Sequence, residues 1–336
     1  MNAPLRTEQK KRLPRDYATD QEVRWCPGCG DYAILKAMQK ALADLDADPA
    51  NTVFVSGIGC AARFPYYVET YGFHTIHGRA PAFATGIKIA NPELDVWVVG
   101  GDGDMLSIGG NHLIHAIRRN VDLNILLFNN EIYGLTKGQY SPTSRIGTKS
   151  PSTPRGSIDS PLHALSLALG AGARFVARGI DTQQKVLPDI LKAAHGHKGA
   201  ALVEIIQNCI VYNDNAFAGF TDRANEADAQ IHLAHGEPLV FGSERDRGLR
   251  LNGRGTALEA FSLADGDPVI HDVRDRHLAI LLAAMEPPLP VAVGVLFDDP
   301  AAVSYERAVE MSDASERDEK ARLGDVLKRT ATWVMP

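Results

Sequence analysis

Short apolar runs alternate with segments of helical period along most of the chain. Five runs rich in aliphatic residues are expected to be buried strands, and the segments between them repeat their apolar residues at the spacing of an α-helix. The expected strands are residues 52–56, 95–99, 123–128, 173–177 and 200–206, and the expected helices are residues 31–45, 80–90, 108–119, 161–170 and 183–195. This alternation is typical of a doubly wound, mostly parallel sheet. The sequence therefore predicts an α/β fold.

The chain divides into three parts that differ in charge and in hydrophobic pattern. Residues 1–24 have mixed charge and no hydrophobic period, so we expect an extended surface arm, whereas residues 25–235 carry the alternation and form the predicted main domain. Residues 236–336 begin with a hairpin pattern at 239–253 and form a C-terminal extension, a candidate contact for a partner. Within the main domain, residues 141–161 are rich in Ser, Thr, Pro and Gly, and a loop of this length is usually a lid or a partner contact.

Composition limits the classes of function. Lys and Arg together number 35 against 41 Asp and Glu, which gives a net charge of −6. Because no block of like charge is present either, a dedicated nucleic-acid binder is not expected. No apolar run approaches the roughly 18 residues that cross a membrane, and the first residues lack the apolar core of a secretory signal. We therefore expect a soluble, cytoplasmic protein without a nucleic-acid or membrane partner.

Two polar motifs follow neighbouring predicted strands. Gly101-Asp102-Gly103 ends the second strand, and Asn129-Asn130 ends the third. In a parallel sheet both motifs lie at the carboxyl edge, where such folds bind ligands. A carboxylate from Asp102, an amide oxygen from Asn130 and the backbone carbonyl of Ile132 suit Mg²⁺, while the glycines let backbone N–H groups approach a diphosphate. The order and spacing of the two motifs resemble those of thiamine-diphosphate enzymes. Two turns without a ligand are the alternative.

Four cysteines, Cys26, Cys29, Cys60 and Cys209, are unevenly spaced. Reducing cytosol favours metal binding or redox chemistry over structural disulfides. The Cys-x-x-Cys after Trp25 differs from a thioredoxin site because a charged arm, and no buried strand, precedes it. Four thiolates from three distant segments suit either tetrahedral zinc or a [4Fe–4S] cluster, and their spacing does not choose between the two.

Five segments together identify a family. The chain is similar to the β subunits of the 2-oxoacid:ferredoxin oxidoreductases, and most of all to those of the 2-oxoglutarate (2-ketoglutarate) enzymes. The resemblance covers about residue 20 to about residue 235. It is carried by WCPGCGDYAIL, GIGCAARF, HGRAPAFATGIKIANPEL, GGDGDMLSIGGNHLIHAIRRN and NNEIYGLTKGQYSPTS.

The resemblance implies a set of cofactors and the residues that hold them. The four cysteines are then the ligands of one [4Fe–4S] cluster, and Asp102, Asn130 and the Ile132 carbonyl bind the Mg²⁺ of thiamine diphosphate. The implied cofactor wall is formed by Ile58, Gly59, Cys60, Ala61, Gly103, Asp104, Gly134 and Leu135. No motif of the family covers residues 236–336.

Three further residues are candidates for contacts in the same site. Arg63 follows Cys60 by three residues, where family members carry a basic residue that faces the substrate, and an arginine fork suits the distal carboxylate of 2-oxoglutarate. Lys137 is by resemblance a coenzyme A contact. His77, just before a helix, is expected to meet a diphosphate oxygen or a substrate carboxylate. The alternatives are a surface arginine, a solvated lysine and a structural histidine.

The implied reaction is the oxidative decarboxylation of 2-oxoglutarate by coenzyme A, which yields succinyl-CoA and CO₂ and passes electrons through the cluster to ferredoxin. Thiamine enzymes also need a glutamate against the aminopyrimidine ring, and this chain holds only the diphosphate-binding half. We therefore expect an α subunit as partner, in a heterodimer or a dimer of heterodimers. The alternatives are the same chemistry on pyruvate or another 2-oxoacid, a non-redox thiamine decarboxylase with structural zinc, and a catalytically silent scaffold.

Overall fold

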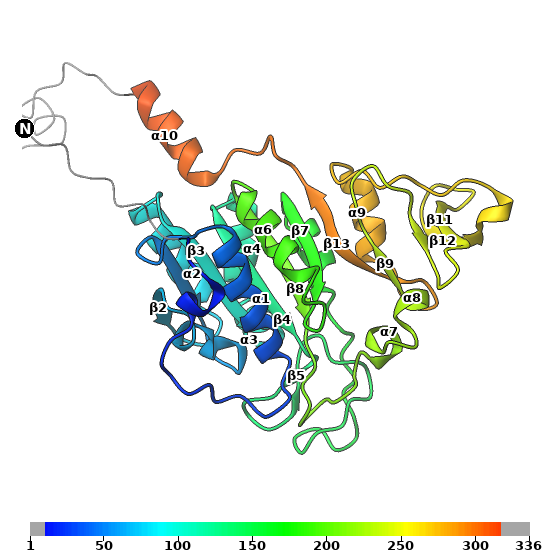
Figure 1. Cartoon of the computed structure of the whole chain (residues 1–336), viewed down its shortest axis with the longest axis horizontal. Coiled ribbons are helices and arrows are strands. Elements are labelled where there is room, and N and C mark those ends of the chain that lie inside the picture. Colours follow the sequence, from blue (N-terminus) through cyan, green and yellow to red (C-terminus); the bar gives the residue numbers. More distant parts are fainter. Residues whose placement is uncertain (1–10, 317–336) are drawn as a thin grey trace, which may run out of the picture.

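The central element of the structure is an eight-stranded sheet in the order β2-β1-β3-β4-β8-β7-β13-β9 (Figure 1). This computed structural model describes residues 11–316. All pairs from β2 to β7 are parallel, and β13 runs antiparallel to β7, so the predicted mostly parallel α/β fold is confirmed. The strands are β1 (Thr52–Ser56), β2 (Tyr71–His74), β3 (Asp95–Gly101), β4 (Leu123–Asn129), β7 (Phe175–Ile180), β8 (Ala200–Ile206), β9 (Gln230–His232) and β13 (Val291–Asp298).

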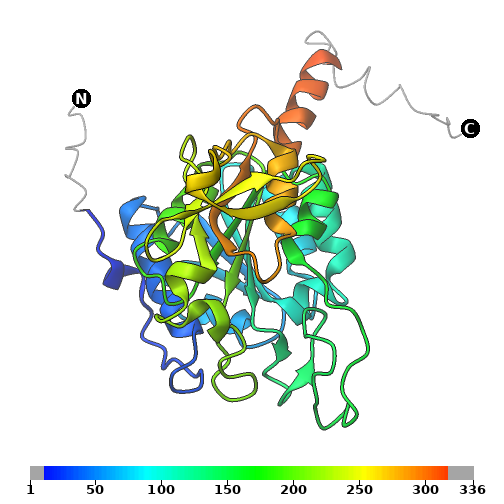
Figure 2. The same cartoon turned by 90° about the vertical axis from the view of Figure 1, so that its right-hand side faces the viewer.

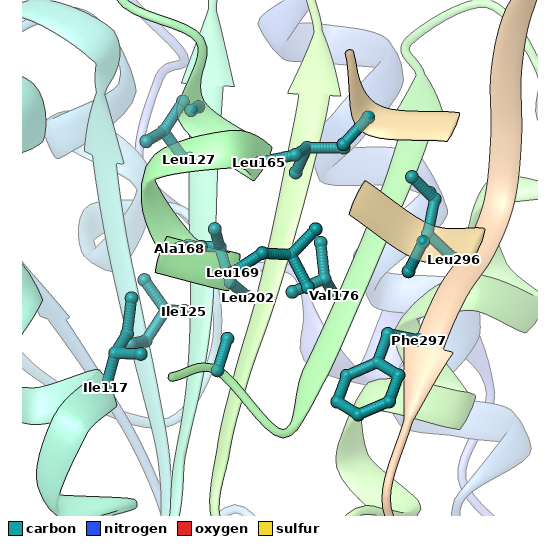
Figure 3. Packing of buried hydrophobic residues seen from close by; sticks show 14 of the residues in the cluster. Ile117, Ile125, Leu127, Leu165, Ala168, Leu169, Val176, Leu202, Leu296 and Phe297 are labelled. Carbon is teal, nitrogen blue, oxygen red and sulfur yellow. The ribbon is translucent and has the colours of Figure 1, made fainter. Parts of the chain in front are cut away.

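Helices cover both faces of the sheet because successive strand residues point to opposite sides. In β1, Val53 and Val55 belong to one apolar cluster and Phe54 to the other. The first face packs against α2 (Ala80–Ala90), α4 (Gly110–Arg119), α5 (Ala164–Gly170) and α9 (Arg276–Ala283), and the second against α1 (Asp31–Asp44) and α6 (Leu187–Gly196). Figure 3 shows side chains of α5 and β13 meeting those of β4, β7 and β8 on the first face. Two cores therefore hold the central strands.

The five strands and five helices expected from the sequence are all present, with ends shifted by up to four residues. Three sheet strands were missed, β2 at one edge and, at the other, β13 and the edge strand β9. All four residues of β2 are exposed, and its outer edge has no strand partner among the described residues. The N-terminal arm also differs from the expected surface segment. Tyr17, in the short helix η1 (Pro14–Tyr17), is fully buried, and its hydroxyl donates to the Ala47 carbonyl (2.7 Å). Residues 1–10 of the arm lie outside the described range.

The segment after residue 235 contributes to the main sheet and also forms a small sheet of its own. The hairpin expected at 239–253 is confirmed, since β10 (Val240–Phe241) pairs antiparallel with β11 (Arg247–Leu251), and β12 (Leu258–Ser262) extends it. The chain then returns as β13 beside β7, and α10 (Tyr305–Glu316) projects from the end of the molecule opposite to the 141–161 loop (Figure 2). Residues 317–336 lie outside the described range.

The remaining elements are short and lie mostly in connections. They are η2 (Ala61–Tyr66), α3 (Asp102–Leu106), β5 (Ile132–Tyr133), β6 (Gln139–Tyr140), α7 (Ala218–Thr221), α8 (Glu226–Ala229) and η3 (Leu263–Asp265). No helix among the described residues is long and apolar enough to cross a membrane.

Candidate functional site

A cavity of about 580 Å³, here called the Asp102 cavity, lies at the carboxyl ends of β1, β3 and β4. Parallel strands place the loops that follow them along one edge, so segments far apart in the chain converge there. All eight residues of the expected cofactor wall, the candidate His77 and all three expected Mg²⁺ ligands line it. They are Ile58, Gly59, Cys60, Ala61, His77, Gly103, Asp104, Gly134 and Leu135, together with Asp102, Asn130 and Ile132. The other lining residues are Gly101, Tyr133, Thr136 and Gln139.

Asp102 is the first residue of α3 and is 1% exposed. Its Oδ2 accepts hydrogen bonds from Ser141 Oγ and Thr143 Oγ1, both at 2.5 Å. Burial raises the pKa of this carboxyl to about 6, although the two hydroxyl donors act in the opposite direction. No basic side chain of the described residues forms an ion pair with it. The ionised form of Asp102 thus lacks a protein counter-charge, which fits a residue that binds a cation.

Asn130 lines the same cavity as Asp102. Its Nδ2 donates to Gln207 Oε1 (2.7 Å), which fixes the orientation of the amide, and its Oδ1 accepts the N–H of Ile132 (3.1 Å). Asn130 Oδ1 keeps a second lone pair for a ligand. The donor set of one carboxylate, one amide oxygen and one backbone carbonyl around a single cavity therefore fits Mg²⁺ bound to a diphosphate.

Two glycines in this site have no room for a side chain. A Cβ on Gly103 would lie 2.3 Å from the Tyr133 ring, whose hydroxyl donates to the Gly103 carbonyl (2.9 Å). A Cβ on Gly57 would lie 2.0 Å from Asp104 Oδ2. The backbone of β1 and α3 can therefore approach the opposite wall closely only because both positions are glycine.

His77 and Asp104 form a close pair on the cavity wall. His77 Nδ1 lies 2.7 Å from Asp104 Oδ1, which also accepts the N–H groups of Ile58 (3.1 Å) and Gly78 (2.7 Å). Asp104 is buried, whereas the His77 side chain is 38% exposed. The carboxylate of α3 thus ties together the loops that follow β1 and β2.

The four cysteines lie around a second cavity of about 230 Å³, here called the cysteine cavity. Cys26 and Cys29 come from the loop before α1, Cys60 from the start of η2 and Cys209 from the loop after β8. A Cβ on Gly134 would lie 3.4 Å from Cys209 Sγ and 3.6 Å from Cys60 Sγ. Within residues 11–316, no group of three or more His, Cys, Asp or Glu side chains lies close enough together to hold a single metal ion. The cysteine cavity has several times the volume of one water molecule, about 30 Å³, which leaves room for a group larger than a single ion.

Cys29, Cys60 and Cys209 are partly buried, whereas Cys26 is exposed. Burial, followed by the nearby Asp31 carboxylate, raises the pKa of both Cys29 and Cys60. Cys29 Sγ also accepts a hydrogen bond from Gln207 Nε2 (3.4 Å), and the Cys60 carbonyl accepts one from Trp25 Nε1 (2.7 Å). Such thiols stay protonated unless a bound metal takes the place of their protons.

Arg63 and Lys137 both line the cysteine cavity, and Arg63 also lines a third cavity of about 400 Å³. This third one, the Arg63 cavity, shares Ile58, Gly59 and Leu135 with the Asp102 cavity. Arg63 Nη1 donates to the Arg24 carbonyl at a long 3.4 Å, so most of its donors are free. Lys137 is exposed and sits at a positive φ of 75° in the turn between β5 and β6.

The sequence did not identify three residues that contact or lie near the expected ligands. Ser141 and Thr143, at the start of the long loop, bind Asp102, and the signal for them was the loop's unusual composition. Asp31, two residues after Cys29, is fully buried at the start of α1, and burial raises its pKa to about 7. The signal for Asp31 was an acidic residue two positions after a Cys-x-x-Cys motif.

Comparison with known proteins points to one family. Residues 57–205 match the model for the thiamine pyrophosphate enzyme, C-terminal TPP binding domain. The 2-oxoglutarate oxidoreductase subunit KorB of Mycobacterium tuberculosis is 53% identical over 276 residues, which are 81% of this chain and 73% of that protein. The 2-oxoacid:ferredoxin oxidoreductase 1, subunit beta, of Aeropyrum pernix is 52% identical over 204 residues, 61% of this chain and 64% of that protein.

A solved structure is similar over nearly the whole length. It is the 2-oxoglutarate:ferredoxin oxidoreductase from Magnetococcus marinus with 2-oxoglutarate, coenzyme A and succinyl-CoA bound. The TM-score is 0.78 at 32% identity, and the match covers 98% of each chain. The resemblance expected from the sequence motifs is thereby confirmed. This chain belongs to the β subunits of the 2-oxoacid:ferredoxin oxidoreductases.

Proposed function

We propose that this chain is the β subunit of a 2-oxoglutarate:ferredoxin oxidoreductase, which converts 2-oxoglutarate and coenzyme A to succinyl-CoA and CO₂. The observation that carries the proposal is the common wall of two cavities. Cys60, Asn130, Gly134 and Leu135 line both the Asp102 cavity and the cysteine cavity. A group that is oxidised in the first cavity would then be separated from an electron acceptor in the second cavity only by this wall.

The residues of the Asp102 cavity would hold thiamine diphosphate and Mg²⁺. The Asp102 carboxylate, Asn130 Oδ1 and the Ile132 carbonyl supply the oxygen ligands, and Gly103 lets backbone N–H groups approach the diphosphate. Ile58 and Leu135 give the same cavity apolar walls. Bound thiamine diphosphate supplies an electron sink that makes the loss of CO₂ from a 2-oxoacid feasible.

The four cysteines would ligate one [4Fe–4S] cluster. Their thiols come from three segments that α1, η2 and β8 hold in place, and the cavity between them has room for more than a single ion. Electrons from the Asp102 cavity would then leave one at a time, and ferredoxin is the proposed final acceptor.

Arg63 would select the substrate, and Lys137 would contact coenzyme A. Arg63 lines the Arg63 cavity, where the distal carboxylate of 2-oxoglutarate could form two parallel hydrogen bonds with its guanidinium. Lys137 lies exposed beside the cysteine cavity, where a cation suits the phosphates of coenzyme A.

An α subunit is the proposed partner, because the Asp102 cavity has no glutamate on its wall among the described residues. We expect the α subunit to supply the glutamate that faces the aminopyrimidine ring. The isolated chain, loaded with its cofactors, should therefore decarboxylate 2-oxoglutarate far more slowly than the assembled complex. Full activity of the isolated chain would contradict this part of the proposal.

The first test is metal analysis with absorbance spectroscopy on the complex, purified without oxygen. We expect about four iron and four sulfide per β chain, and an absorbance that 2-oxoglutarate with coenzyme A bleaches. The matched variant Cys209→Ser should lose iron while still binding thiamine diphosphate. Bleaching by pyruvate or another 2-oxoacid would change only the substrate. Zinc in place of iron, with no response to substrate, would refute the redox function and favour a non-redox decarboxylase.

A further inference from the structure

An open groove of about 490 Å³, here called the Pro27 groove, adjoins the loop that carries Cys26 and Cys29. Cys29 lines both this groove and the cysteine cavity, just as Cys60 lines both the cysteine cavity and the Asp102 cavity. The groove and the Asp102 cavity have no lining residue in common. The cysteine cavity therefore lies between the two and meets each of them at a different cysteine.

The wall between the groove and the cysteines is thin because two of its residues are glycine. A Cβ on Gly30 would lie 1.9 Å from Asp181 Oδ2, and a Cβ on Gly28, where φ is 84°, would lie 2.9 Å from Ile210 Cδ1. Residues 26–28 of the same loop are exposed. On this side a single loop of the described chain thus separates the cysteines from solvent.

Two lysines without an ion pair lie beside the groove. Lys36 lies one turn after Tyr32, which lines the groove, on the exposed face of α1, since residues four apart share a face of a helix. Lys185 lies in the segment before α6, where the neighbouring Gln184 donates through Nε2 to the Ala33 carbonyl of α1 (2.9 Å). Both lysines are exposed, and neither forms an ion pair with any residue that the structure describes.

Acidic side chains lie near the groove as well, but most of them are paired or buried. Glu22 pairs with Arg24 (3.1 Å), and Asp181 is 4% exposed. Asp214 is exposed and accepts a hydrogen bond from Asn208 Nδ2 (2.9 Å). Two lysines against one exposed carboxylate without an ion pair leave the rim of the groove positive, although the whole chain has a net charge of −6.

We propose that the Pro27 groove is the surface on which ferredoxin docks to take electrons, and that the ferredoxin presents an acidic surface to it. This inference rests on the proposed function. Ferredoxin takes one electron per docking event, the group that the four cysteines hold loses that electron, and two events complete the oxidation of one 2-oxoacid. Electrons enter on the side of Cys60 and leave on the side of Cys29. A small contact steered by charge suits a carrier that must leave after each electron.

The other opening of the cysteine cavity is less suited to a protein carrier. Arg63 and Lys137 lie there, where the cysteine cavity adjoins the Asp102 cavity and the Arg63 cavity. A protein bound on that side would obstruct the cavities that 2-oxoglutarate and coenzyme A have to enter. Docking at the Pro27 groove leaves those cavities open, so that substrate and carrier can bind at the same time.

The test compares Lys36→Glu and Lys185→Glu with the matched control Lys198→Glu in the assembled, cofactor-loaded complex. Lys198 is exposed and precedes β8, so the control makes the same charge change at the opposite edge of the sheet. The probe is the oxidised ferredoxin of the same organism, and calorimetry gives its Kd. At about 50 mM salt we expect each groove variant to raise the Kd by roughly fivefold or more, and at about 0.5 M salt by less than about twofold, because salt screens exposed charges. The control should match the wild type.

A second measurement separates docking from the reaction. Bleaching of the complex by 2-oxoglutarate with coenzyme A, in the absence of ferredoxin, should keep its wild-type rate in all three variants. If the wild type does not bleach, the proposed function fails, whereas the Kd values need no substrate and still decide the docking.

Four results would overturn the groove as the docking surface. They are a wild-type complex that does not bind ferredoxin, an unchanged Kd in both groove variants, an equal effect of Lys198→Glu, and a raised Kd found only in Lys137→Glu, which would place ferredoxin at the other opening. Failure of the groove variants to assemble with the α subunit, seen by size-exclusion chromatography, would also contradict the proposal, because the groove would then belong to a subunit interface.

Discussion

The side chain of Asp102 is held ready for a cation by two hydroxyl groups. Ser141 and Thr143 both donate to Oδ2, and burial raises the pKa of the carboxyl to about 6. A raised pKa means that the folded chain keeps the proton more tightly than the unfolded chain does. Acid therefore competes directly with metal for this residue.

This competition predicts a pH-dependent affinity for the cofactor. Below about pH 6 Asp102 is neutral, so we expect the affinity for Mg²⁺ with thiamine diphosphate to fall by up to tenfold per pH unit as the carboxylate is lost. Calorimetric titration between about pH 7.5 and about pH 5 checks the expectation. Asp102→Asn, which cannot ionise, should bind weakly and show a flat profile over that range. A wild-type affinity independent of pH would contradict the role of Asp102 as the charged ligand.

Arg63 gives a prediction about substrate choice. Removing the guanidinium in Arg63→Ala should raise the KM for 2-oxoglutarate by about tenfold or more, since hydrogen bonds between charged groups contribute about 1.5–3 kcal/mol. The KM for pyruvate, which has no distal carboxylate, should stay the same. Arg63→Lys keeps the charge without the fork and should fall between the two. Steady-state kinetics with both substrates decide, and an unchanged KM for 2-oxoglutarate would refute the assignment.

At the scale of elements, β13 connects the C-terminal part of the chain to the main core. Leu296 and Phe297 are buried against α5, α9 and β7 (Figure 3). We expect Phe297→Ala to lower the free energy of unfolding by about 3–5 kcal/mol, the usual cost of deleting a buried aromatic ring. Ile158→Ala, at a side chain 89% exposed, should change it by less than about 0.5 kcal/mol. Denaturant unfolding of the two variants measures both values, and a similar effect in both would contradict the packing.

The strands that could be predicted from the sequence are those buried on both faces. β1, β3, β4 and β8 are continuous apolar runs between clear turns. A short run of that kind is typical of a strand that is buried on both faces of a parallel sheet. β2 escaped prediction because its four residues are exposed and carry no apolar run. β13 escaped because it stands alone after prolines, far along the chain from the strand it pairs with.

The same difference applies to the site. Asp102 and Asn130 were predictable because each lies directly after a strand, so that the sheet itself brings them together. Ser141 and Thr143 were not, because the path of a long loop depends on tertiary contacts that have no local pattern. The His77–Asp104 pair joins two motifs that were each identified, yet the hydrogen bond between them appears only once β1, β2 and β3 lie side by side.

At the scale of the whole molecule, the part after residue 235 belongs to the fold of the main sheet. A chain that ends at residue 235 would lose β13 and leave β7 with an uncovered edge. We expect that truncated chain to be insoluble or to lose cooperative unfolding. A chain that ends at residue 299 keeps β13, loses α10, and should unfold cooperatively with a smaller loss of stability. Circular dichroism during denaturant titration compares the two, and a stable, cooperative chain of 235 residues would show that the extension is dispensable.

The open outer edge of β2 has a consequence for how a cell must make this protein. Tyr71 and Phe73 flank a row of unpaired backbone groups, and two such edges can join one another when nothing else covers them. Copies whose β2 edge stays uncovered would therefore be prone to aggregate as they accumulate in the cell.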